Sequence, residues 1–132
     1  MLVTLSGINP AAAAPKDFHV TYKSGSNYAQ NYYNVDITGT VTRTGDRYEL
    51  KGTVKARCIR KQGPDQLWSL AFGSSAESWR YTRGSCTDEL TTTAIKETGR
   101  LRTDGRVYLQ AGAYGGEALG AWGWGTERSV WV

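Results

Sequence analysis

Two stretches of the chain, residues 35–42 and residues 48–58, alternate between apolar and polar side chains with a period of two. Such alternation is typical of β-strands that bury one face. The connection between them contains Thr44-Gly45-Asp46-Arg47, a short polar segment with one glycine. A connection this short joins antiparallel neighbours, so the two stretches predict a β-hairpin.

The length of this connection also predicts the register of the hairpin. The pairs that it places opposite each other are Val41 and Leu50, Ile37 and Val54, Val35 and Ala56, and Gly39 and Gly52. The two facing glycines leave a gap in the apolar face, which either accepts a large aromatic side chain from a facing sheet or allows the strands to coil sharply. We therefore expect a second sheet to pack over this hairpin.

Further extended segments follow the hairpin, separated by glycine-rich and polar turn signals. The expected strands are residues 67–72, 78–82, 90–101 and 107–113, followed by a last segment at 118–132, and the expected turns are residues 62–65, 73–76, 83–85, 103–105 and 115–117. Residues 27–33 fit either an edge strand or a surface loop. Turns at this spacing predict an all-β fold, an antiparallel β-sandwich or partly open barrel of about seven to nine strands.

The N-terminal residues differ in composition from the rest of the chain. Residues 11–14 form an alanine run that resembles the cleavage end of an export signal. We interpret residues 1–14 as the remnant of such a signal and residues 15–132 as a single β domain; the alternative is that residues 1–16 are a disordered or partner-bound tail. No segment approaches the ~18–20 apolar residues of a membrane span. The sequence therefore predicts a secreted protein that does not insert into a membrane.

The two cysteines, Cys58 and Cys86, agree with export. We expect them to form one intramolecular disulfide, whose loop of about 27 residues would contribute ~3–4 kcal/mol in the chain-entropy description. The alternative is a pair of buried thiols in a cytosolic protein. The chain has no C-x-x-C motif, so neither a thioredoxin-like site nor a zinc site is supported.

The charged residues do not indicate a nucleic-acid partner. The chain has 16 Lys and Arg against 12 Asp and Glu, a net charge of +4. The basic residues are scattered and are densest at residues 57–61 and 100–102, whereas nucleic-acid-binding proteins more often show a basic stripe interleaved with aromatics. Solvated strand faces are the expectation, and a polyanion site is the alternative.

The sequence also lacks the residues that an enzyme requires. His19 is the only histidine and lies beside the export-like segment, where a nucleophile–histidine arrangement is poorly supported. Many acidic residues occupy predicted turns, where Asp bonds to the backbone; examples are Asp46, Asp65, Asp88 and Asp104. We therefore expect no catalytic residues, no metal and no cofactor.

The tryptophans near the C-terminus are the first candidate binding residues. Trp122 and Trp124 alternate with glycines, so they would lie on one face of a strand. They are interpreted either as core side chains beneath a sandwich or as an aromatic platform for sugar rings or a protein partner.

The second candidate is the segment Ser-Trp-Arg-Tyr-Thr at residues 78–82. The guanidinium of Arg80 can form charge-assisted hydrogen bonds with carboxylates while Trp79 and Tyr81 fill adjacent pockets. The segment resembles the Trp-Arg-Tyr stretch of the small secreted α-amylase inhibitors of the tendamistat type. In that family the triplet sits on an exposed hairpin that blocks the amylase active site, and a cysteine follows soon after, as Cys86 does here. The resemblance implies an enzyme inhibitor; the alternative is an ordinary strand with two core aromatics and an exposed arginine.

A broader resemblance concerns the whole chain. The alanine-rich N-terminus, the Thr- and Gly-rich hairpins and the stretch Gly-Arg-Val-Tyr-Leu-Gln at residues 105–110 are similar in style to small secreted β-sandwich proteins of actinobacteria, some of which are adaptor subunits of secreted toxin particles. We therefore expect a secreted, non-catalytic binding module. Its partner would be another secreted or cell-surface protein, such as a toxin-complex subunit or a glycoside hydrolase, and carbohydrate is the alternative.

Overall fold

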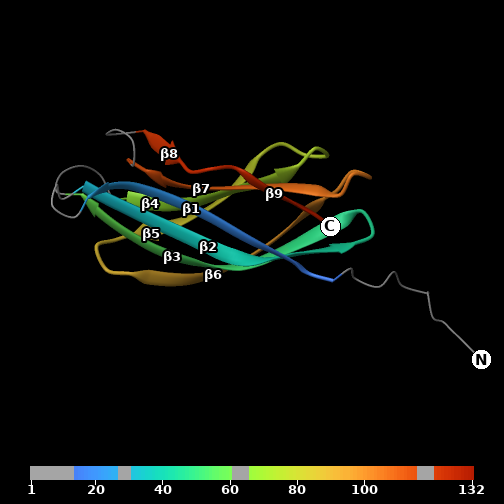
Figure 1. Ribbon diagram of the computed structural model, residues 1–132, viewed down its shortest axis with the longest axis horizontal. Helices are drawn as coiled ribbons and strands as arrows, with labels where there is room; N and C mark the ends of the chain where they lie inside the picture. The colour runs from blue at the N-terminus through green and yellow to red at the C-terminus, as the bar shows by residue number, and fades with distance from the viewer. Residues whose placement is uncertain (1–13, 27–30, 61–65, 116–120) are drawn as a thin grey trace, which may run out of the picture.

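The computed structural model describes residues 14–26, 31–60, 66–115 and 121–132 as two antiparallel sheets packed face to face (Figure 1). The nine strands among these residues are β1 (Lys16–Ser26), β2 (Asn31–Thr44), β3 (Arg47–Arg60), β4 (Gln66–Ser74), β5 (Arg80–Cys86), β6 (Thr91–Arg100), β7 (Arg106–Tyr114), β8 (Trp122–Trp124) and β9 (Arg128–Trp131). Sheet A has the order β1-β2-β3-β6. Sheet B has the order β5-β4-β7, with β8 and β9 both paired to the free side of β7. The predicted β-sandwich is confirmed.

The predicted register of the first hairpin is also confirmed. Strands β2 and β3 place each of the four expected pairs opposite one another, Gly39 and Gly52 included. The gap above these glycines is filled by Phe18, which lies opposite Gly39 on the neighbouring strand β1. A Cβ on Gly39 would lie 2.8 Å from Phe18 Cε2. The aromatic side chain therefore comes from the same sheet and not, as one expectation had it, from the facing sheet.

Apolar side chains from both sheets meet in one core between the layers. Strand β4 contributes Trp68, Leu70 and Phe72, and strand β7 contributes alternate residues from Val107 to Ala113, all of them buried. Strand β4 is also buried on its other face: Ser69 is 0% exposed and Ala71 is 3% exposed. Side chains on the outer surface of sheet B must therefore cover this strand.

Two of the predicted turns have a different role. Residues 83–85 lie inside strand β5 and not in a turn, because Gly84 makes room for the indole of Trp68, whose Cε2 would lie 2.6 Å from a Cβ at that position. The turn at residues 103–105 is present, with Gly105 at φ 66°. It leads from β6 in sheet A to β7 in sheet B, so the prediction of a hairpin there was wrong.

The N-terminal part of the domain contributes more to the sandwich than its sequence pattern had indicated. Residues 16–26 form an entire strand, β1, and Asn31 to Tyr33 begin the long strand β2, in which Tyr33 is fully buried. The interpretation of residues 1–14 as the remnant of an export signal lies, except for Ala14, outside the described residues and stays a prediction. The same holds for the turn at residues 62–65 and for residues 116–117 of the turn expected at 115–117.

The expected disulfide between Cys58 and Cys86 is present, with 5.3 Å between the two Cα atoms. It joins the end of β3 in sheet A to the end of β5 in sheet B. The backbone N–H of Cys58 also donates to the carbonyl of Thr87 at 2.7 Å, so the two layers are fastened at this end of the sandwich. Within the described residues no helix is long and apolar enough to cross a membrane.

Candidate functional site

The outer surface of sheet B has small residues at its centre and large residues on either side. Because side chains alternate along a strand, the residues between the core positions of β4 and β7 point outward. The small outward residues are Ser69, Ala71, Gly73 and Gly112, and among them Gln110, opposite Ala71, is bonded to the carbonyl of Gly125. The large ones are Trp79, Tyr81, Arg83, Arg106, Tyr108, Tyr114, Trp122, Trp124 and Trp131. We call these nine large residues the aromatic face.

One group of the aromatic face is centred on the tryptophans of β8. The rings of Trp122 and Trp124 stack with centroids 5.6 Å apart and planes inclined by 21°. Trp124 lies over Gly112, where a Cβ would be 2.5 Å from its ring, and its centroid is 5.9 Å from that of Tyr81. The guanidinium of Arg83 reaches across the small residues, with Cζ 4.4 Å from the Trp122 centroid.

A second group lies toward the other end of the same face. Trp79 and Tyr108 meet edge to face, with centroids 6.4 Å apart and planes at 60°. Arg106 places its Cζ 4.7 Å from the Tyr108 centroid and 5.0 Å from that of Trp131. Its Nε donates to Ser129 Oγ at 3.0 Å, which holds the guanidinium in this position.

The two groups together cover strand β4, which explains why that strand is buried on both faces. Three rings nevertheless remain open to solvent: Trp79 is 40% exposed, Tyr81 49% and Trp131 57%. These rings therefore provide an apolar surface without the movement of any other element.

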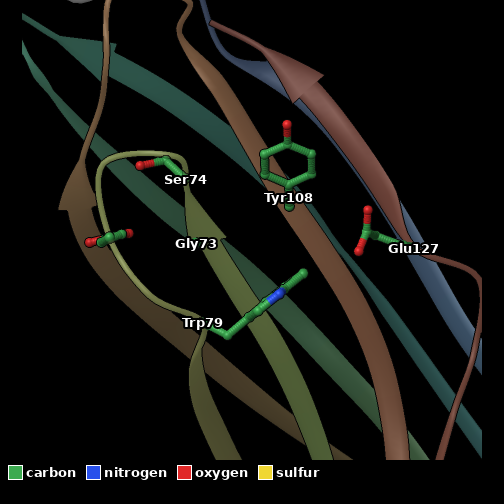
Figure 2. A pocket seen from close by; sticks show the side chains of 6 residues that line it. Gly73, Ser74, Trp79, Tyr108 and Glu127 are labelled. Carbon is green, nitrogen blue, oxygen red and sulfur yellow. The ribbon is translucent and has the colours of Figure 1, made fainter.

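A cavity of about 220 Å³ opens within the second group (Figure 2). Its lining residues are Gly73, Ser74, Glu77, Trp79, Tyr108 and Glu127. Trp79 extends across the cavity toward Glu127, and the ring of Tyr108 stands beside them (Figure 2). A Cβ at Gly73 would lie 3.2 Å from the carbonyl oxygen of Ser78, so this glycine allows the segment that carries Trp79 to pass close to β4.

Arg80 does not point the same way as its neighbours Trp79 and Tyr81. It lies opposite Phe72 in the pairing of β5 with β4, and its guanidinium is 4.8 Å from the Phe72 ring. It donates a hydrogen bond to the carbonyl of Thr98 on β6 and lies 3.7 Å from Glu77 Oε1. The side chain of Arg80 therefore links the edges of the two sheets, and the three residues of the Trp-Arg-Tyr segment do not form one continuous surface.

Glu77 is the centre of this link between the sheets. It accepts a hydrogen bond of 2.5 Å from the hydroxyl of Tyr48 and a longer one from the backbone N–H of Arg100. Burial, followed by this hydrogen bond to Glu77, raises the pKa of the Tyr48 phenol well above its ordinary value. Tyr48 is therefore a neutral donor throughout the physiological range, as the link requires.

Four of the five candidate binding residues, Trp79, Tyr81, Trp122 and Trp124, lie together on the aromatic face, although the sequence had indicated two separate sites. The other members, Arg83, Arg106, Tyr108, Tyr114 and Trp131, were not among the candidates. The alternation along β7 was a usable signal, since it already predicted that Tyr108 and Tyr114 point away from the core.

The outer surface of sheet A has a different composition. It is polar, and its outward side chains include Thr38, Thr53, Lys51, Lys55 and Lys96. His19 lies there, exposed, 3.0 Å from Asp36. In the described part of the chain no group of three or more His, Cys, Asp or Glu residues is arranged to hold a metal ion.

No protein-family model, no curated protein and no solved structure matches the chain.

Proposed function

We propose that this protein is an exported, non-catalytic binding module that holds another protein through its aromatic face. The observation that supports the proposal is the gathering of seven aromatic rings and two arginines on one outer surface of the sandwich. Trp, Tyr and Arg are the residue types that dominate the binding energy of protein interfaces. The opposite surface, on sheet A, has no comparable group among the described residues.

The arrangement of the rings favours a protein partner over carbohydrate. A flat platform for sugars needs rings that lie side by side in one plane. Trp122 and Trp124 instead stack on each other, and Arg83 covers part of Trp122. The exposed rings Trp79, Tyr81 and Trp131 are spread around this packed centre, which suits the uneven surface of a folded protein.

Export is supported by the disulfide. Bonds of this kind persist in oxidising compartments and are rare in the cytosol, where thiols are kept reduced. The bond between Cys58 and Cys86 joins the two sheets and therefore belongs to the folded domain itself.

The test uses variants of the most exposed rings. Immobilised protein is incubated with the secreted fraction of the producing cells, and captured proteins are identified by mass spectrometry. The double variant Tyr81→Ala, Trp131→Ala should lose a partner that the wild type captures, because truncating an aromatic residue that anchors an interface costs about 2 kcal/mol or more, roughly 30-fold in Kd. The matched control is Thr38→Ala, Lys55→Ala on sheet A, which should retain the partner. Equal capture by both double variants would contradict the proposal, and binding to polysaccharide alone would favour the carbohydrate alternative.

The alternative function, inhibition of α-amylase through residues 79–81, is tested by a separate assay. We expect no inhibition of α-amylase at micromolar concentration, because Arg80 bonds to Thr98 and approaches Glu77 on the side of β5 away from Trp79 and Tyr81. An activity assay with the wild type and Arg80→Ala measures this directly. Inhibition by the wild type that is lost in Arg80→Ala would contradict this expectation and restore the inhibitor function.

A further inference from the structure

We infer that the cavity between Trp79 and Tyr108 accepts an alkylammonium group, the side chain of a lysine on the partner protein. The inference rests on the proposed function and names the chemistry that would anchor the partner to the aromatic face. Three features of the cavity support it: the geometry of its rings, its charge and its remaining hydrogen-bonding capacity.

The two rings form a corner. Their planes meet at 60° with centroids 6.4 Å apart, so a group seated in the cavity meets one ring face and the neighbouring ring at the same time. Aromatic corners and cages bind ammonium groups, because the negative ring face attracts the cation within about 6 Å. The cavity volume of about 220 Å³ lies below the roughly 300–1,000 Å³ typical of sites for drug-sized ligands, and this favours a single side chain.

The lining carries negative charge in a protein whose net charge is +4. It includes two carboxylates, Glu77 and Glu127, and neither Lys nor Arg. Glu77 already interacts with the Tyr48 hydroxyl, the backbone N–H of Arg100 and the guanidinium of Arg80, whereas Glu127 has no hydrogen-bond or ion-pair partner among the described residues. The nearby guanidinium of Arg106 is held over Tyr108 by Ser129. The carboxylate of Glu127 is thus the charge that remains available for a cation.

The polar groups of the cavity fit a cation better than a sugar. A neutral sugar requires several donors and acceptors around its hydroxyls. Ser74 Oγ is already used twice, because it donates to the carbonyl of Arg100 at 2.5 Å and accepts from the N–H of Ala76 at 3.1 Å. An ammonium group needs only the ring faces and one carboxylate, and both are present.

The experiment titrates the folded protein with Nα-acetyl-lysine methylamide and follows the indole N–H signal of each tryptophan by NMR. We expect a saturable shift of the Trp79 signal, assigned from its loss in Trp79→Ala. Choline should produce a comparable shift, and its neutral isostere 3,3-dimethyl-1-butanol should not. Glu127→Gln keeps the shape of the side chain and should weaken binding roughly fivefold, the upper range for one exposed ion pair. The matched control Glu89→Gln, in an exposed segment outside the aromatic face, should bind as the wild type does.

Equal shifts with choline and with its neutral isostere would overturn the inference. So would the absence of a Trp79 shift at up to about 100 mM, far above the millimolar Kd expected of a single side chain. A shift produced by methyl glucoside and insensitive to Glu127→Gln would also overturn it, in favour of a sugar. None of these results contradicts the proposed function if the double variant Tyr81→Ala, Trp131→Ala still loses the partner in the capture experiment. Saturable binding of the lysine probe that weakens in Glu127→Gln supports the inference. If, in addition, no captured protein depends on the aromatic face, the proposed function fails and the inference about the cavity does not.

Discussion

Replacing Phe18 with Ala should lower the free energy of unfolding by about 3–5 kcal/mol, the range for a large aromatic side chain removed from a core. The ring of Phe18 is 5% exposed and lies over two glycines that have no side chains to close the gap themselves. The backbone of two paired strands cannot collapse into the space that the ring leaves. Urea denaturation followed by circular dichroism measures the effect.

Two matched variants identify the cause of this loss. Phe18→Leu keeps an apolar group over the glycines and should cost clearly less than Phe18→Ala. Asp17→Ala changes the exposed neighbour on the same strand and should remain within about 0.5 kcal/mol of the wild type. A loss below about 1 kcal/mol in Phe18→Ala would mean that the ring does not support the hairpin.

The sequence predicted the centre of sheet A because its signals there are local. A period-two pattern on both sides of a short connection allows one register, and Gly39 therefore had to face Gly52. Strand β1 has the same alternation, with Phe18, Val20 and Tyr22 on its buried side, and was predictable in principle. Its pairing with β2 could not be deduced, since the turn-forming residues 24–27 (Ser-Gly-Ser-Asn) predict a turn earlier than the connection, which follows Ser26.

The role of Gly84 could not be predicted from the local sequence. Gly84 was interpreted as a turn residue, yet it lies in the middle of β5 because the indole of Trp68 occupies the space of its absent side chain. A glycine in a turn and a glycine within a strand can both be flanked by polar residues. Only the position of a ring from another strand, here Trp68, distinguishes the two cases. The turn at residues 103–105 raises the same difficulty, because local sequence does not reveal whether a turn pairs its strands or passes from one sheet to the other.

The candidate site was predictable in its parts but not in its assembly. Alternation placed Trp122 with Trp124, and Trp79 with Tyr81, on common faces. That these two pairs meet follows from the strand order β5-β4-β7-β8, which depends on pairing between distant segments. The same alternation implies that Arg80 points away from its two neighbours, so the period of two is by itself enough to divide the triplet between opposite surfaces of the strand.

Removing the disulfide should lower the free energy of unfolding by about 3–4 kcal/mol, from the loop entropy that a separation of 28 residues imposes on the unfolded chain. The bond joins β3 to β5, and β5 pairs with β4 alone. The double variant Cys58→Ala, Cys86→Ala tests this without a reductant. Its denaturant slope m should also exceed that of the wild type, because an unfolded chain without the cross-link exposes more surface.

The second consequence of removing the disulfide concerns the aromatic face. Tyr81 and Arg83 lie on β5, so a loosened strand would present them less rigidly, and binding should weaken through the added cost of ordering them. Wild-type protein treated with reductant should behave as the double variant does, which separates loss of the bond from any packing effect of alanine. A stability loss below about 1 kcal/mol together with unchanged m would contradict the entropic account and would leave the hydrogen bond from Cys58 to Thr87 as the main fastening of the two sheets.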